Sequence, residues 1–88
     1  MNSYKYIGHL RANTGVRFWY AEQEVQPWRL TYRGQGHYFS NISALCGYAA
    51  GRHWIHTFQI NALADQLEAN ANSILIFEPE THKKRRYR

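Results

Sequence analysis

The sequence predicts an α+β domain: an antiparallel β-meander of three to four strands, two short helices, and a C-terminal strand that returns to the sheet. Three observations indicate this fold class. Residues 4–39 hold short runs of β-branched and aromatic residues separated by turn residues, a pattern typical of strands. Residues 41–67 hold two segments whose apolar residues recur at helical spacing. Residues 73–77 (SILIF) form a mainly apolar run, short enough for a buried strand.

The first two strands are expected over residues 4–11 and 16–21. The segment Asn13-Thr14-Gly15 separates them, and its glycine tolerates the positive φ that a tight hairpin turn requires. The first strand alternates only in part. The second places alternate side chains on opposite sides: Val16, Phe18 and Tyr20 on one, Arg17 and Trp19 on the other.

The polar stretch over residues 22–26, followed by Pro27, is expected to end the second strand, because proline cannot donate a hydrogen bond to a central ladder. The third strand is expected after Pro27. Over residues 28–33, large apolar and aromatic residues alternate with polar ones in the most regular period-two pattern of the chain. The segment Gly34-Gln35-Gly36 supplies the next turn. Residues 37–39 then form a short fourth strand.

The first helix is expected from Asn41 to Ala50, with Ser40 or Asn41 as its N-cap and Gly51 as a left-handed C-terminal cap. Cys46 lies on the apolar face of this helix, which indicates a small core residue rather than a reactive thiol. The second helix is expected over residues 60–70, which are rich in good helix formers.

The segment between the two helices, residues 52–59, is ambiguous. Its aromatic and β-branched residues favour a short strand or an extended link, whereas its place between two helical patterns is compatible with an ordered loop. In a strand, Trp54, His56 and Phe58 would share the apolar side, so His56 is expected to be half-buried in the core.

The chain is expected to form one compact domain over residues 1–80, followed by a basic and flexible tail over residues 81–88. The formal net charge of the 88 residues is +5, and the five cations of the tail account for this excess. Residues 1–52 hold six Lys or Arg and two Glu, whereas residues 53–80 hold four acids and no Lys or Arg. The body is therefore neutral but polarised.

Composition disfavours several classes of protein. No apolar run approaches the roughly 20 residues of a membrane span, and the N-terminus lacks the apolar core of a signal peptide, so a cytoplasmic protein without a membrane partner is expected. The single cysteine excludes an internal disulfide and a cysteine-based zinc site. Because the histidines lack metal-ligand spacing and no phosphate-binding loop is present, we expect neither a metal nor a cofactor.

The face of the meander opposite its core is the first candidate site. It is expected to hold Arg17, Trp19, Arg29 and Arg33, joined by Lys5, His9 and Arg11 if the first strand pairs in register. Guanidinium groups bind phosphates, and a ring such as Trp19 offers a base a stacking surface. A protein interface is equally compatible, since Trp, Tyr and Arg are enriched at binding hot spots. The simplest alternative is the polar face that any one-sided antiparallel sheet shows.

The tail is the second candidate site. Its cations are Lys83, Lys84, Arg85, Arg86 and Arg88. Such a run gains affinity for phosphates by counterion release, without sequence preference and with strong salt dependence. The alternative is a solvated terminus.

A group of histidines is the third candidate: His37, His53 and His56, with Arg52 and Tyr38 nearby in sequence. A histidine pair with a cation is chemically sufficient for metal-independent cleavage of RNA, in which the 2′-hydroxyl is the nucleophile. Against this, residues three apart in a strand, such as His53 and His56, point to opposite faces.

These observations favour a small non-enzymatic binding module. It is expected to act on nucleic acid, or on a protein complex that handles nucleic acid, through the sheet face and the basic tail. One alternative is a phage-type stoichiometric inhibitor of a host nuclease or CRISPR complex, for which Asp65 and Glu68 would offer an acidic surface. The other is a small toxin-like ribonuclease. The oligomeric state is not predicted.

Overall fold

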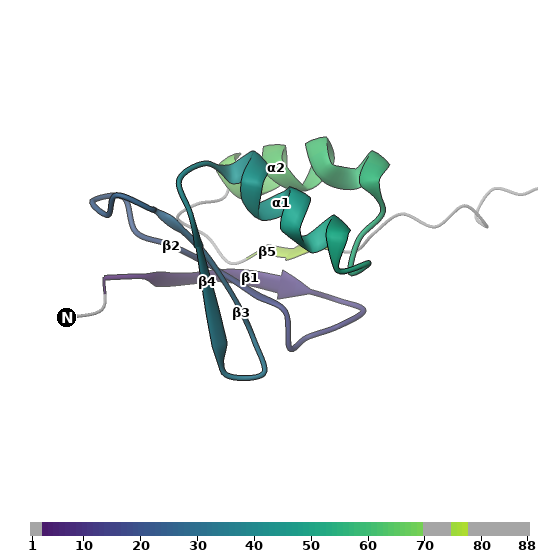
Figure 1. The fold of residues 1–88 in the computed structure, drawn as a ribbon, viewed down its shortest axis with the longest axis horizontal. Helices are drawn as coiled ribbons and strands as arrows, with labels where there is room; N and C mark the ends of the chain where they lie inside the picture. The colour runs from purple at the N-terminus through teal and green to yellow at the C-terminus, as the bar shows by residue number, and fades with distance from the viewer. Residues whose placement is uncertain (1–2, 70–74, 78–88) are drawn as a thin grey trace, which may run out of the picture.

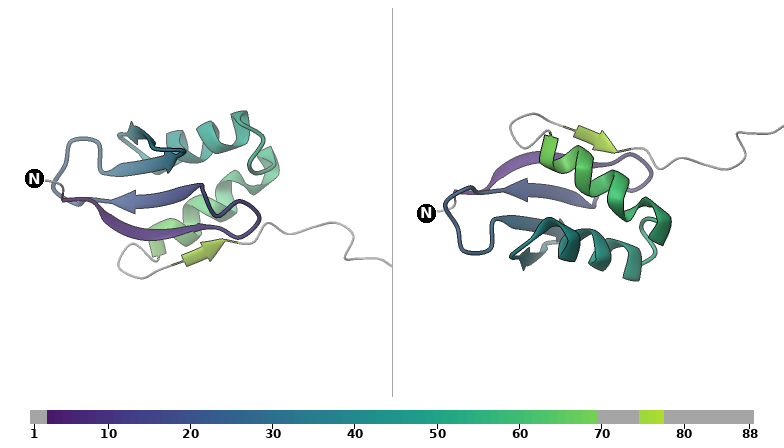
Figure 2. Two further views of the ribbon diagram at one scale, coloured as in Figure 1. Left: turned by 90° about the horizontal axis from the view of Figure 1, so that it is seen from below. Right: turned by 90° about the horizontal axis from the view of Figure 1, so that it is seen from above.

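The computed structural model describes residues 3–69 and 75–77. Within these residues two α-helices cover one face of a five-stranded sheet, and the other face is left open (Figures 1 and 2). The elements, in chain order, are β1 (Lys5–Leu10), β2 (Arg17–Tyr20), β3 (Trp28–Tyr32), β4 (Gln35–Phe39), α1 (Ile42–Gly51), the 3₁₀ helix η1 (Thr57–Gln59), α2 (Ile60–Ala69) and β5 (Leu75–Phe77). The basic tail lies outside the described residues.

The sheet has the strand order β4-β3-β2-β1-β5. The first four strands form an antiparallel meander, as the turn residues between them predict. After the two helices the chain returns to the far edge, where β5 pairs with β1 in parallel. The predicted α+β class, with its meander, two helices and returning strand, is confirmed.

The core lies between the covered face of the sheet and the two helices. On β2 and β3 the alternation works as predicted, because Phe18 and Leu30 are completely buried and Trp28 nearly so. The helices contribute their apolar faces, whose fully buried members are Leu45, Cys46, Ala49, Leu63 and Leu67. Burial raises the pKa of the Cys46 thiol to about 12, helped by the negative charge of Glu68. The thiol is therefore neutral and enclosed, as expected of a core residue.

Different kinds of hydrogen bond cap the two ends of α1. At the N-terminus, the side chain of Asn41 accepts a hydrogen bond from the backbone N–H of Ala44 at 2.8 Å. At the C-terminus, the backbone N–H of His53 donates to Ala50 O (2.9 Å) and that of Trp54 donates to Ala49 O (3.0 Å). This pair of bonds is the Schellman motif.

The residue in the left-handed region of that motif is His53, with φ of 65°. Gly51, which the sequence favours for this role, is instead the last helical residue. The helix therefore extends further than predicted, and a non-glycine residue adopts the positive φ. The two Schellman hydrogen bonds provide the compensating stabilisation, because they satisfy carbonyl groups at the helix end.

The strand favoured for residues 52–59 is wrong, and the alternative of an ordered connection describes the segment better. The segment is a turn that leads into η1. It buries Ile55 and Gln59, which are not on the side of Trp54, His56 and Phe58 that was expected to face the core. His56 is exposed and stacks on the ring of Phe58, with centroids 5.3 Å apart. The Gln59 side chain accepts a hydrogen bond from the backbone N–H of His56 at 2.8 Å, so the local capping geometry overrides the strand propensity of these residues.

Asn41→Ala is expected to lower the free energy of unfolding by about 1 kcal/mol, the usual effect of losing an N-cap side chain. Urea denaturation followed by circular dichroism measures this change. Ser40→Ala is the matched control, because Asn41 and not Ser40 supplies the cap. Equal destabilisation by the two substitutions would contradict the assignment.

Candidate binding face on the open side of the sheet

Strand register places one row of side chains across the open side of the sheet. Tyr6 lies opposite Trp19, Trp19 lies opposite Arg29, and Arg29 lies opposite Tyr38. Directly opposed residues in antiparallel strands project to the same face. The row therefore crosses β1, β2, β3 and β4 on the side that the helices leave uncovered. The left view of Figure 2 shows the strands from this side, with the helices behind them. We call this row, with the neighbouring Tyr4 and His9, the outer face.

A bulge in β1 determines which of its residues join the outer face. The register shifts between Tyr6 and Gly8, so that Tyr6 pairs with Trp19 while Gly8 pairs with the buried Phe18. The extra residue, Ile7, is completely buried. As a result Tyr6 and His9, three apart in sequence, lie on the same face, and the Tyr6 hydroxyl hydrogen-bonds to Nδ1 of His9. An unbroken strand would have placed them on opposite faces.

Arg29 is the centre of the outer face. Its guanidinium carbon lies 5.1 Å from the ring centre of Trp19, 5.6 Å from that of Tyr38 and 5.7 Å from that of Tyr4. Each distance is within the range of a cation–π contact. The Nε atom of Arg29 is buried and has no hydrogen-bond partner among the described residues. The cation is thus held between rings rather than by an acid.

The rings around Arg29 are themselves fixed by their neighbours. The Trp19 indole donates a hydrogen bond to Thr31 Oγ1 at 2.9 Å and meets the ring of Tyr6 edge-on, with centroids 5.4 Å apart. The Tyr4 hydroxyl donates to the backbone oxygen of Gln26 at 2.6 Å, and its ring meets that of Tyr38 edge-on. Desolvation raises the pKa of Tyr4, with further increases from Glu24 and Tyr38 and a smaller opposing effect of Arg29. The hydroxyl, which is protonated at neutral pH even in an unperturbed tyrosine, can therefore donate. The outer face is consequently preorganised.

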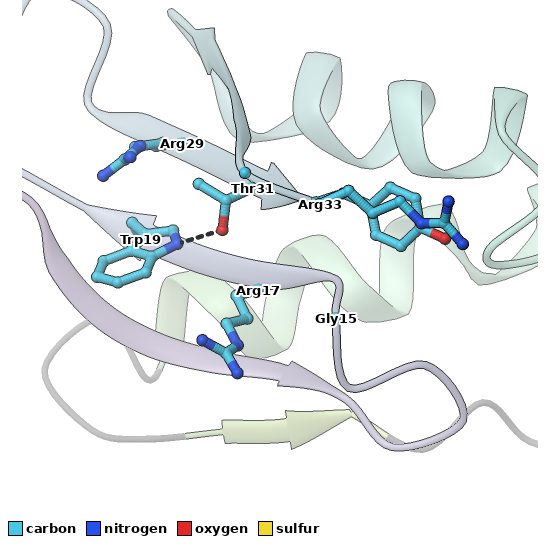
Figure 3. A pocket seen from close by; sticks show the side chains of 8 residues that line it. Gly15, Arg17, Trp19, Arg29, Thr31 and Arg33 are labelled. Atoms are coloured by element: carbon cyan, nitrogen blue, oxygen red, sulfur yellow. Dashed lines mark hydrogen bonds between the residues drawn. The ribbon is translucent and has the colours of Figure 1, made fainter.

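A pocket of about 380 Å³ adjoins the outer face (Figure 3). Its lining residues are Gly15, Arg17, Trp19, Arg29, Thr31, Tyr32, Arg33 and Gly34. Two turns contribute to its wall, because Gly15 belongs to the β1–β2 connection and Gly34 to the β3–β4 hairpin. The lining contains three arginines and no acidic residue. Their guanidinium groups do not converge, because that of Arg33 lies over the Tyr32 ring and points away from Arg17 and Trp19 (Figure 3).

The predicted surface residues fall in different places. Arg17, Trp19, Arg29 and His9 lie on the open side of the sheet, whereas Arg33 lies in the β3–β4 turn and lines the pocket. Arg11 is exposed in the connection after β1. Lys5 does not join the outer face: it lies opposite Tyr20, whose ring packs against Trp28 on the helix side. The tail residues Lys83, Lys84, Arg85 and Arg86 lie outside the described part of the chain.

Three tyrosines of the outer face, Tyr4, Tyr6 and Tyr38, were missed by the sequence reasoning. Tyr4 and Tyr6 have the two-residue spacing of one strand face, a signal that could have grouped them. Tyr38 becomes adjacent to Arg29 only through the pairing of β3 with β4. The contact therefore depends on a register that the sequence does not state.

The histidine group is not assembled around Tyr38. His37 lies on the helix side, where its ring is 4.8 Å from that of Tyr48, whereas Tyr38 contacts Arg29 on the open side. His53 and His56 are exposed in the connection between the helices. Within residues 3–69 and 75–77, no cluster of three or more His, Cys, Asp or Glu side chains is placed to hold a metal ion. None of the helices described there is long and apolar enough to cross a membrane.

The chain was compared with protein-family models, with curated proteins and with solved structures, and none of the three comparisons gives a match.

Proposed function

We propose that this chain is a non-enzymatic module that binds single-stranded nucleic acid through the outer face, assisted by the basic tail. The observation that supports this function best is the row of rings and cation that runs across four neighbouring strands. Aromatic rings offer stacking surfaces to bases, and arginines neutralise phosphates. The outer face combines both groups within one preorganised surface.

The arrangement favours single strands over duplexes. Bases reach an aromatic side chain only when they are unstacked from their neighbours, as in loops and single strands. A duplex is commonly read by a helix or a two-stranded ribbon that enters its major groove, whereas the outer face belongs to a sheet whose helices lie on the opposite side. The preference for single strands follows from this geometry.

A fluorescence-anisotropy titration tests the proposal. Labelled single-stranded and duplex oligonucleotides are titrated at low and near-physiological salt with the full chain and with a full-length variant in which the five tail cations are replaced by Gln. Retained, salt-sensitive binding of the single strand by the variant supports a site on the outer face. Binding that disappears with the tail charges would refute it, and would favour a protein partner for the outer face, since its Trp, Tyr and Arg residues also suit a protein interface.

Gly36→Ala is expected to weaken oligonucleotide binding about twofold to threefold, equivalent to weakening one cation–π contact. A Cβ atom at Gly36 would lie 3.3 Å from Nε of Arg29 and 3.5 Å from the Tyr38 hydroxyl, so the Arg29 side chain would have to shift slightly against its rings, without any change of charge. The same titration measures the affinity.

The matched control for this substitution is Gly47→Ala on α1, where a Cβ would meet nothing within 4 Å. We expect Gly47→Ala to raise helix stability, by about 1 kcal/mol, and to leave the affinity unchanged. Unaltered affinity in a folded Gly36→Ala variant would mean that the position of Arg29 is unimportant for binding.

A further inference from the structure

A second set of side chains lies beside the row on the open side of the sheet. Strand register places His9 opposite Arg17 and Arg17 opposite Thr31, and directly opposed residues in antiparallel strands project to the same face. We call His9, Arg17 and Thr31 the polar row. It crosses β1, β2 and β3 alongside the row that contains Trp19. On β2 and β3 the two rows are two residues, or about 7 Å, apart.

Hydrogen bonds join the two rows. The Tyr6 hydroxyl bonds to Nδ1 of His9. A hydroxyl that donates to Nδ1 requires the ring proton to be on Nε2, from which it can be donated to an anion. The Trp19 indole donates to Thr31 Oγ1 at 2.9 Å, and this hydroxyl keeps its own hydrogen for donation. Both polar side chains are therefore held by an aromatic neighbour and retain a donor for an anion.

Arg17 supplies the positive charge of the polar row. Its side chain is exposed, and a long hydrogen bond of 3.4 Å from its Nε to the backbone oxygen of Thr14 anchors it at the β1–β2 turn. The terminal nitrogens of a guanidinium group are further donors. The pocket is lined by members of both rows, Arg17 and Thr31 of one and Trp19 and Arg29 of the other (Figure 3). The open side of the sheet is therefore hollowed where the two rows meet.

Acidic residues lie at the opposite end of these strands. The β2–β3 connection contains Glu22 and Glu24, both exposed, and Ser3 Oγ donates to the Glu24 carboxylate at 2.7 Å. Along β2 the order is therefore Arg17, then Trp19, then the acidic connection. A polyanion that lies over Trp19 is attracted on the side of the polar row and repelled on the other side.

We propose that the sugar–phosphate backbone of the bound strand runs along the polar row, across β1, β2 and β3, while its bases stack on the row that contains Trp19. Arg17 is the cationic ligand of the phosphates, and His9 and Thr31 donate hydrogen bonds to neighbouring phosphate oxygens. This inference rests on the proposed function and adds the path of the strand and its phosphate ligands. The three side chains need not converge, because successive phosphates of one strand are separate groups.

Two full-length variants test this path by removing one cation each from neighbouring strands. Arg17→Gln removes the cation of the polar row. Lys5→Gln removes an exposed cation at the other end of β1, opposite Tyr20 and outside the outer face. Fluorescence anisotropy with a labelled single strand is repeated over a series of salt concentrations. The titrations give the slope of the logarithm of the binding constant against the logarithm of the salt concentration.

Arg17→Gln should reduce the magnitude of this slope by about 0.7, the contribution of one phosphate contact to the binding of a single strand. Lys5→Gln should leave the slope unchanged. The reduction should be the same for oligonucleotides of different sequence, because phosphates carry no sequence information. Equal reductions by both variants, or none by Arg17→Gln, would overturn the path and leave the proposed function standing if the wild type binds.

A strand without bases separates the two rows. With an oligonucleotide made of abasic residues, Arg17→Gln should reduce the salt slope by the same amount as with the normal strand. Trp19→Ala should weaken binding of the abasic strand far less than binding of the normal one, because no base is present to stack. Equal weakening of both strands by Trp19→Ala would mean that the rows do not divide bases from phosphates, and would overturn the inference.

His9→Ala removes one hydrogen-bond donor of the polar row. It should weaken binding of both strands about twofold to tenfold, the usual range for one hydrogen bond. Unchanged affinity in a folded His9→Ala variant would overturn the assignment of His9 as a phosphate ligand. Failure of every oligonucleotide to bind the wild type would refute the proposed function and the path together.

Discussion

Trp19→Ala is expected to weaken binding of single-stranded oligonucleotides roughly 5- to 150-fold, because stacking of one base on an aromatic side chain contributes about 1–3 kcal/mol. Trp19 lies between Tyr6 and Arg29 in the row and also lines the pocket. Its removal therefore takes away a stacking surface and one of the rings that position Arg29. Fluorescence anisotropy at constant salt measures the loss.

Two substitutions separate the contribution of the ring from that of its support. Trp19→Phe keeps an aromatic surface and should retain most of the affinity. Thr31→Val keeps the indole but removes the hydroxyl that accepts its hydrogen bond, so a smaller loss is expected. If a folded Trp19→Ala variant bound as tightly as the wild type, the outer face would not be the binding site.

Much of the outer face could be predicted from alternation alone. In residues 16–20 and 28–32 the side chains alternate between the two faces of the sheet. Because Phe18 and Leu30 must be buried, Arg17, Trp19 and Arg29 are expected on the opposite face. The two helices could be predicted equally well, because their apolar residues recur at i, i+3, i+4 and i+7. Both predictions depend on local periodicity.

The remaining features depend on contacts between distant segments. The bulge at Ile7 cannot be read from the partial alternation of β1, yet it decides that Tyr6 and His9 share a face. The pairing of β3 with β4 brings Tyr38 to Arg29. At the end of α1, the Schellman bonds place His53 rather than Gly51 in the left-handed region. In each case tertiary or capping geometry outweighs the preference of the single residue.

The fold also separates in space the cations of the N-terminal half from the acids that follow them in the sequence. Arg17 and Arg29 lie on the open side of the sheet, whereas the exposed acids Asp65 and Glu68 lie on α2, in the layer that covers the opposite side. The cations of the outer face are therefore separated from the acids of α2, and among the described residues Glu24 is the acid that acts on this face, through Tyr4. The separation is consistent with the proposed binding of a polyanion at the outer face.

Phe18→Ala is expected to lower the free energy of unfolding by about 3–5 kcal/mol, the range found for removing a buried phenyl ring. Phe18 is completely buried in the cluster that joins the central strand β2 to the helices. Domains of this size have only about 5–15 kcal/mol of stability in total, so the variant should be partly unfolded at 37 °C. Urea denaturation at low temperature, followed by circular dichroism, measures the change.

The oligonucleotide affinity of a second variant, Phe18→Leu, distinguishes a structural role of Phe18 from a direct role in binding. Phe18 lies between Arg17 and Trp19 in sequence but points away from them, into the core. Phe18→Leu, which keeps most of the apolar volume, should restore most of the stability and all of the affinity, because the side chains of the outer face are unchanged. Loss of affinity in a Phe18→Leu variant that is as stable as the wild type would show that the core packing of β2 directly sets the geometry of the outer face.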